Sequence, residues 1–159
     1  MIKIQIPATS ANLGAGFDAL GLALTYYNYI EMEECNKIDI TAADGLDIPT
    51  DERNLIYISA KDLFAVCGKK LEGLKLIQTS NIPMARGLGS SSACIIAGLV
   101  GANKMLGDPL TKDDLVDLAA QIEGHPDNTA PALLGGIVTA VFDERKVHWV
   151  KQEVFTKLK

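Results

Sequence analysis

The sequence predicts a domain that contains both strands and helices. Some segments alternate apolar and polar residues or run apolar as strands do, and others carry apolar residues at helical spacing behind capping residues. The chain has 159 residues and is 48% hydrophobic, which suffices for one ordinary domain with its own core. We therefore expect residues 1–159 to form one unit.

The expected strands come from period-two and continuous apolar stretches. Residues 2–6 alternate and end at Pro7, which predicts a half-buried first strand. An apolar and aromatic stretch at 20–34 predicts one long strand or a bent pair. Shorter strands are expected at 37–41, 74–77, 133–142 and 147–150, the last two as a hairpin.

Three helices are expected. The first should be capped by Thr50 and end before Gly68, and the third, at 111–123, opens on a capping-box pattern. The second, at 93–102, is apolar almost all round and needs cover on every side. We expect part of that cover, and of the cover for the strand at 133–142, to come from outside this chain. An exposed apolar patch and self-association should follow.

Composition excludes several classes of protein. The net charge of −5 and the sequence pI near 5.0 leave no broad basic field for nucleic acid or an anionic membrane. Cys35, Cys67 and Cys94 are odd in number and lack C-x-x-C spacing, which argues against a disulfide framework or a zinc site. No apolar run is long enough to span a bilayer, and the N-terminus lacks the apolar block of a signal peptide. We expect a cytoplasmic protein with reduced thiols.

The first candidate site is the loop at 83–93. Gly87 and Gly89 allow positive φ and close approach of a ligand, and three serines follow as helix caps. The free N–H groups and the dipole of the helix favour an anion such as a nucleotide phosphate there. Valine at Gly89 should therefore weaken the binding of such a nucleotide far more than it lowers the stability of the fold. The loop matches neither G-x-x-x-x-G-K-[ST] nor G-x-G-x-x-G, so a loop that merely starts a buried helix stays an alternative.

Two further polar segments are candidates. Residues 7–18 are mostly small or polar and include two glycines, which indicates a loop. This loop is either a plain surface turn or a functional segment. Residues 123–131 gather two carboxylates, an imidazole and an amide within six residues. Such groups can hold a metal, orient a hydroxyl or bind an amino acid, although an ordinary turn is the alternative.

Together, the three segments resemble the superfamily of galactokinase, homoserine kinase, mevalonate kinase and phosphomevalonate kinase, most closely its homoserine kinase branch. The loop at 83–93 is similar to the P-x-x-x-G-L-G-S-S-A ATP motif, with Ser92 in place of alanine. The resemblance implies an α+β fold, namely an N-terminal kinase domain like ribosomal protein S5 domain 2, with a mixed sheet packed by helices. The family also has a C-terminal ferredoxin-like domain, with a third glycine-rich motif and arginines that clamp the substrate carboxylate. No such motif follows residue 142, so this chain resembles an N-terminal half.

The resemblance also implies a reaction and a set of residues. The reaction is ATP-dependent phosphorylation of the side-chain hydroxyl of L-homoserine, a step toward threonine, with Mg²⁺ and with a homodimer as a possible assembly. Ser91 and Glu123 would hold Mg²⁺, and Asn12, Asp18 and His125 would bind the amino acid. Asn54 would contact adenine, and the remaining nucleotide contacts would come from Pro83, Arg86, Gly87, Leu88, Gly89, Ser90, Ser91 and Ser92.

The catalytic roles leave one choice open. Several sister kinases use an aspartate at the position of Asp127 as general base, assisted by a lysine where this sequence has Thr9. Because phosphoryl transfer depends mainly on positioning and charge neutralisation, we expect Asn128 to orient the hydroxyl, with Asp127 structural or electrostatic.

Three other functions stay open at this point. They are a non-catalytic nucleotide-binding module, a kinase of another small hydroxylated substrate, and a dinucleotide-binding oxidoreductase. The last rests on Asp108, about twenty residues after Gly87, near the spacing of a ribose-binding acid.

Overall fold

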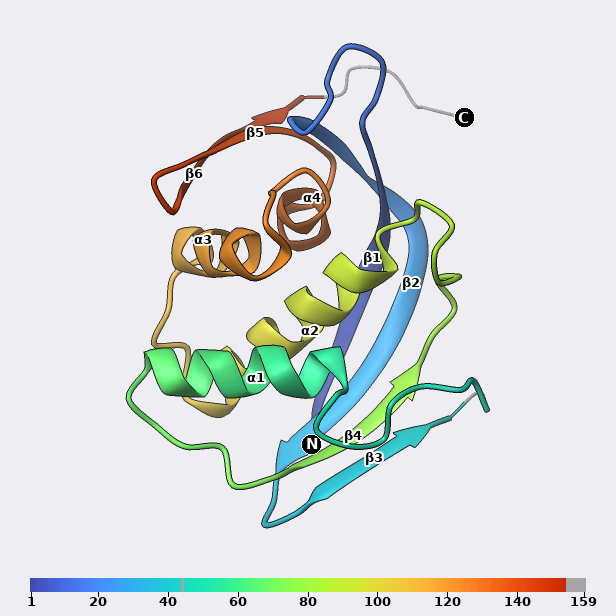
Figure 1. Ribbon diagram of the computed structural model, residues 1–159, viewed down its shortest axis with the longest axis vertical. Coiled ribbons are helices and arrows are strands. Elements are labelled where there is room, and N and C mark those ends of the chain that lie inside the picture. Colours follow the sequence, from blue (N-terminus) through green and yellow to red (C-terminus); the bar gives the residue numbers. More distant parts are fainter. Residues whose placement is uncertain (44, 154–159) are drawn as a thin grey trace.

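The computed structural model describes residues 1–43 and 45–153. The strands are β1 Ile2–Ala11, β2 Leu20–Glu34, β3 Ile38–Ala42, β4 Leu74–Thr79, β5 Ile137–Asp143 and β6 Lys146–Gln152. The helices are α1 Leu55–Val66, α2 Ser90–Met105, α3 Lys112–Glu123 and α4 Thr129–Leu134 (Figure 1). The predicted α+β class with a mixed sheet is confirmed.

The sheet is built around β2. Strand β1 pairs antiparallel along one edge of β2, while β4 and β5 pair antiparallel with the two ends of its other edge. Strand β3 lies parallel to β4, and α1 connects them. Strand β6 pairs antiparallel with β5 and completes the order β3-β4-β2-β5-β6, with β1 beside β2.

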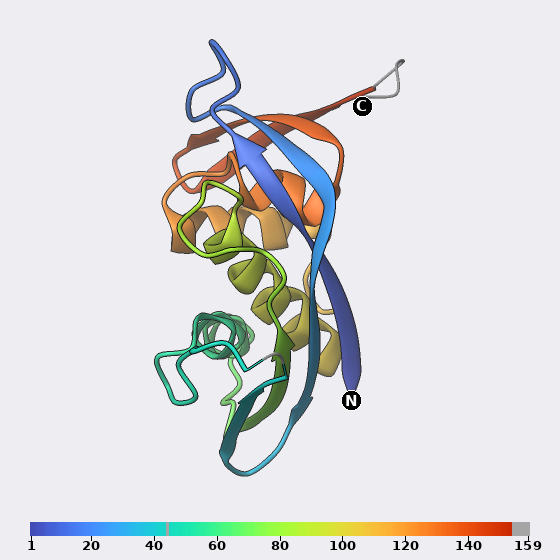
Figure 2. The same cartoon turned by 90° about the vertical axis from the view of Figure 1, so that its right-hand side faces the viewer.

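The helices cover one face of this sheet (Figure 2). Between them lies the main core, which includes Ile30, Met32 and Leu99 with 0–2% exposure. On the opposite face, Lys3 forms an ion pair with Glu31. Strands β1 and β2 thus carry polar side chains on the face away from the helices, whereas β5 and β6 expose Val141 and Val150 to solvent. Within the described ranges, no helix is long and apolar enough to cross a membrane.

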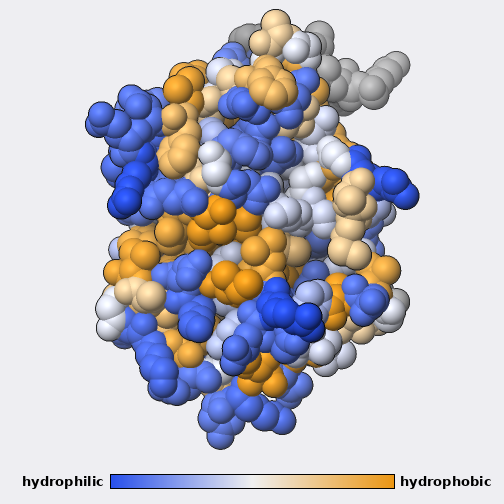
Figure 3. All heavy atoms as spheres, viewed as in Figure 1, coloured by the Kyte–Doolittle hydropathy of each residue, from blue (hydrophilic) through white to orange (hydrophobic). Residues whose placement is uncertain are grey.

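Helix α2 is buried by its own chain. It contacts α1, β1, α3 and α4, and added Cβ atoms at Gly98 and Gly101 would overlap the carbonyl oxygen of Ile56 and the Sδ of Met32. Glycine thus permits the close packing that encloses this helix. The expectation that its cover comes from outside the chain is wrong for the residues described. Apolar atoms nevertheless gather across the middle of the face seen in Figure 3.

Strand β1 is longer than the sequence indicates. It runs through Pro7 to Ala11, with its register to β2 shifted between Pro7 and Thr9. Proline has no N–H for a ladder, so it is tolerated at this irregularity and the strand resumes after it. Residues 7–11, expected as loop, are strand, and residues 20–34 form one strand rather than a bent pair.

Two helix boundaries also differ. Asn54, not Thr50, caps α1, because its Oδ1 accepts from the backbone N–H groups of Ile56 and Tyr57. The run at 133–142 is not one strand, since its first two residues end α4 and Gly135, with a φ of 71°, separates them from β5. The capping box of α3 and the β5–β6 hairpin are confirmed.

Candidate active site

The loop at 83–93 leads into the N-terminus of α2. Gly89 is the N-cap residue in a left-handed conformation, with a φ of 65°, and no side chain caps the first N–H groups. The expectation that the serines cap this helix is therefore wrong. The first turn keeps its backbone N–H groups and the positive end of the dipole for another partner, such as an anion.

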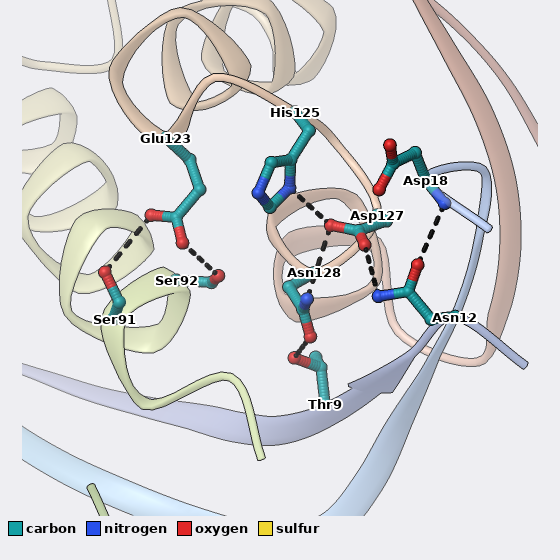
Figure 4. Close-up of polar contacts among 9 residues, drawn as sticks. All are labelled: Thr9, Asn12, Asp18, Ser91, Ser92, Glu123, His125, Asp127 and Asn128. Atoms are coloured by element: carbon teal, nitrogen blue, oxygen red, sulfur yellow. Dashed lines mark hydrogen bonds and ion pairs between the residues drawn. The ribbon is translucent and has the colours of Figure 1, made fainter. Parts of the chain in front are cut away.

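The hydroxyls of two serines turn instead to Glu123, the last residue of α3. Ser91 Oγ and Ser92 Oγ donate to the two carboxylate oxygens of Glu123, each at 3.2 Å (Figure 4). The sequence predicts the pairing with Ser91 but not the second one. This oxygen-only donor set suits Mg²⁺, which prefers few protein oxygens and takes the rest from phosphate and water. The described residues contain no group of three or more His, Cys, Asp or Glu that could hold a metal ion.

A second polar cluster surrounds Asp127, whose side chain is 1% exposed. Its Oδ1 lies 2.6 Å from His125 Nδ1 and accepts from Asn128 Nδ2 at 3.3 Å. Its Oδ2 accepts from Asn12 Nδ2 at 3.4 Å. A buried carboxylate needs such donors, because desolvation without them is costly. Since both oxygens are engaged by the protein, the arrangement favours a structural or electrostatic role over that of a free base.

The same cluster orients its neighbours. A carboxylate only accepts hydrogen bonds, so the Nδ1 of His125 carries the proton toward Asp127 and leaves Nε2 for a ligand. Asn12 Oδ1 accepts from the backbone N–H of Asp18 at 3.0 Å, and both residues have positive φ. The fold therefore brings together the three residues predicted for the amino acid (Figure 4).

A cavity of about 290 Å³ adjoins the loop. Of the residues predicted for the nucleotide, it is lined by Asn54, Ser90 and Ser91, but not by Pro83, Arg86, Gly87, Leu88, Gly89 or Ser92. Both ends of the Asn54 amide are already bonded, since it caps α1 and its Nδ2 donates to Pro49 O at 2.9 Å. Its contact with adenine stays a prediction.

Sequence reasoning missed several residues around the site. Gln78 and Cys94 line the cavity, and burial raises the pKa of the Cys94 thiol to about 11. Gly21 lies against the loop after α3, where a Cβ would overlap the carbonyl oxygen of Asp127. A lone glycine inside an apolar strand was the available signal for that close approach, whereas nothing in the local pattern marks Gln78.

Gly89 also has a structural role. A Cβ added there would overlap Thr9 Oγ1, and its φ is unfavourable for other residues. Valine at this position should therefore strain the fold as well as the loop, and the expectation that ATP binding falls far more than stability stays a prediction.

The arrangement of helices on one face of a β2-centred sheet, with a glycine loop opening α2, defines an α+β domain with an anion site at a helix N-terminus. Residues 54–136 match the GHMP kinases N terminal domain, and the chain belongs to the GHMP kinase family. It is 47% identical over 162 residues to the homoserine kinase of Petrotoga mobilis, covering 100% of this chain and 53% of that one. It is 50% identical over 157 residues to that of Carboxydothermus hydrogenoformans, covering 97% and 52%.

A solved structure shows the same likeness. A protein from Listeria monocytogenes, assigned as a homoserine kinase, superposes with a TM-score of 0.84 at 42% identity, over 94% of this chain and 53% of that one. The chain thus spans about half the length of the curated relatives it matches.

Proposed function

We propose that this chain supplies the nucleotide and amino-acid binding part of a kinase. The reaction is transfer of a phosphoryl group from ATP to the side-chain hydroxyl of L-homoserine, giving O-phospho-L-homoserine on the way to threonine. One observation carries the proposal. The segment from Glu123 to Asn128 joins the serines at the N-terminus of α2 to the buried carboxylate cluster. The homoserine kinases that match 97–100% of this chain support this substrate.

The nucleotide phosphates would lie at the first turn of α2, where the backbone N–H groups have no side-chain cap. Ser91 and Glu123 would hold Mg²⁺, which neutralises charge on the phosphates when it is bound. The cavity beside Ser90 would receive the base. Its mixed apolar and polar lining suits a planar heterocycle.

The acceptor would lie at the Asp127 cluster. The exposed carboxylate of Asp18 suits the ammonium group of the substrate, while Asn12 and the Nε2 of His125 complete its binding. Asn128 has a second N–H on Nδ2 that can donate to the acceptor hydroxyl and orient it. Asp127 is buried with both oxygens bonded, so its proposed contribution is to hold these neighbours. A loose transition state needs positioning more than early proton removal.

The setting of the protein is proposed on the same basis. Residues 1–159 would act as one ATP-binding unit, and the segment that matches the remaining length of the relatives would complete the site with its carboxylate clamp. The three free cysteines of the described structure fit a reducing compartment such as the cytoplasm.

The test is a panel of substrates. It uses the protein extended to the length of its relatives, that is, residues 1–159 joined to the segment that matches the rest of those relatives. With Mg-ATP, homoserine should give phosphohomoserine by phosphorus NMR, at a kcat/KM about 10-fold or more above that for L-serine, which is one methylene shorter. Binding of Mg-ATP without phosphorylation of any alcohol would instead establish a nucleotide-binding module. Tighter binding of NAD than of Mg-ATP by calorimetry would remove the kinase proposal.

A further inference from the structure

Thr9 lies where the phosphate loop meets the acceptor cluster. It follows the register shift in β1 and is 0% exposed. Its backbone N–H donates to Leu88 O at 3.1 Å. Its Oγ1 lies 2.7 Å from Asn128 Oδ1 (Figure 4). One side of Thr9 therefore contacts the proposed nucleotide loop, and the other contacts the residue proposed to orient the acceptor.

The direction of the Thr9–Asn128 hydrogen bond follows from Asp127. Because a carboxylate only accepts, Asn128 must turn its Nδ2 toward Asp127, and its Oδ1 then faces Thr9. The Thr9 hydroxyl is thus the donor. Together Thr9 and Asp127 prevent the amide from flipping, so the remaining N–H on Nδ2 is the group that Asn128 can present to a ligand.

The Thr9 hydroxyl also fills the space beneath the N-cap of α2. A Cβ at Gly89 would overlap Thr9 Oγ1 and lie 3.2 Å from Asn128 Oδ1. Gly89, the Thr9 hydroxyl and the Asn128 amide are therefore in direct contact, so a shift of the loop at Gly89 must displace the hydroxyl. A displaced hydroxyl no longer holds the Asn128 amide in place.

We propose that Thr9 is a positioning residue that couples the nucleotide loop to the orientation of the Asn128 amide. The inference rests on the proposed phosphotransferase function and deepens it. Its hydroxyl holds the amide in the donating orientation, and its contact with Gly89 transmits the position of the loop when nucleotide binds. Loss of the hydroxyl should therefore reduce turnover while nucleotide affinity is retained.

The kinetic test compares variants of the protein extended to the length of its relatives. Thr9→Val keeps the branched shape and removes the hydroxyl, Thr9→Ser keeps the hydroxyl, and Thr41→Val on the exposed side of β3 is the matched control. We expect Thr9→Val to lower kcat about 10- to 100-fold, while its Kd for ATP stays within about 3-fold. Thr9→Ser and Thr41→Val should keep kcat within about 3-fold. An unchanged kcat in Thr9→Val, or equal losses in Thr9→Val and Thr9→Ser, would overturn the proposal.

A second readout does not depend on turnover. In the same proteins labelled with ¹⁵N-asparagine, the side-chain amide of Asn128 is assigned by its loss in Asn128→Asp. Mg-ATP should shift this resonance in the wild type and in Thr9→Ser but not in Thr9→Val. An equal shift in Thr9→Val refutes the coupling even if homoserine is phosphorylated. A wild type that turns over no homoserine but shows this pattern refutes only the substrate assignment.

Discussion

The proposed metal site depends on Glu123, because its carboxylate accepts hydrogen bonds from the hydroxyls of both Ser91 and Ser92. Glu123→Gln keeps the shape and one accepting oxygen but removes the charge. We expect it to weaken Mg-ATP binding about 10-fold, which is about 1.4 kcal/mol, and to leave metal-free ATP binding nearly unchanged. Calorimetry with Mg²⁺ and with EDTA measures both. Glu72→Gln, an exposed position paired with Lys70, is the control, and an intact metal dependence in Glu123→Gln would show that Glu123 is not a ligand.

The alkylation rate of Cys94 can test whether nucleotide occupies the cavity that this residue lines. Burial raises the pKa of its thiol to about 11, and the thiolate is the species that reacts with alkylating agents. Its alkylation should be slow at pH 8 and rise about tenfold per pH unit up to pH 10. Bound Mg-ATP should slow it, because Cys94 lines the cavity proposed for the base.

Peptide mapping by mass spectrometry follows each thiol separately. Cys67, the C-cap residue of α1, does not line that cavity and should react at the same rate with and without nucleotide. Rapid labelling of Cys94 at pH 8 would contradict its burial, and labelling that ATP leaves unchanged would place the nucleotide elsewhere.

At the scale of elements, the two glycines of the loop before α2, Gly87 and Gly89, differ in how closely β1 packs against them. Both have positive φ, but a Cβ at Gly87 meets nothing within 4 Å, whereas one at Gly89 overlaps Thr9. Gly87→Ala should cost about 1–2 kcal/mol of the free energy of unfolding from backbone strain alone. Gly89→Ala should cost about 1–3 kcal/mol more from overpacking. Urea unfolding of the two variants tests this directly, and equal losses would mean that Thr9 moves aside without cost.

The elements also show why some predictions failed. The run at 133–142 is apolar throughout, and a short apolar run does not distinguish a buried helix from a buried strand. The last two residues of helix α4 were assigned to the strand for this reason, whereas its first three, Thr129–Pro131, lay in the polar segment at 123–131, for which an ordinary turn was the alternative. Strand β1 passes Pro7 because, among the described strands, it pairs with β2 alone, so its other edge has no ladder that proline would break.

At the scale of the whole molecule, the 159-residue chain buries its own central helix and carries polar side chains on the open face of the sheet. We therefore expect it to unfold cooperatively and to be stabilised by Mg-ATP, by about 2.7 kcal/mol at 100 times Kd. It should not phosphorylate homoserine measurably, whereas the protein extended to the length of its relatives should. Thermal unfolding and an assay for ADP release measure the two effects. Equal turnover by both chains would show that residues 1–159 contain the complete site.

Local patterns were sufficient for most of the strands and helices, for the buried α2, for the capping box of α3 and for the three polar segments near the site, whereas the α+β class with a mixed sheet was predicted from the family resemblance. Each local pattern depends on residues that lie within one or two turns or one strand of each other, and short-range sterics and periodicity act at that distance.

The pairing of those segments was decided by tertiary structure. The bond between Thr9 and Asn128 joins residues 119 positions apart, and that between Ser92 and Glu123 joins residues 31 apart. Gln78 of β4 meets Cys94 of α2, 16 positions away, where both line the cavity. Such hydrogen bonds require atoms within about 3 Å and a suitable angle. Only the packing of the strands and helices sets distances this precisely, so the sequence indicated which groups were available and the fold determined which of them meet.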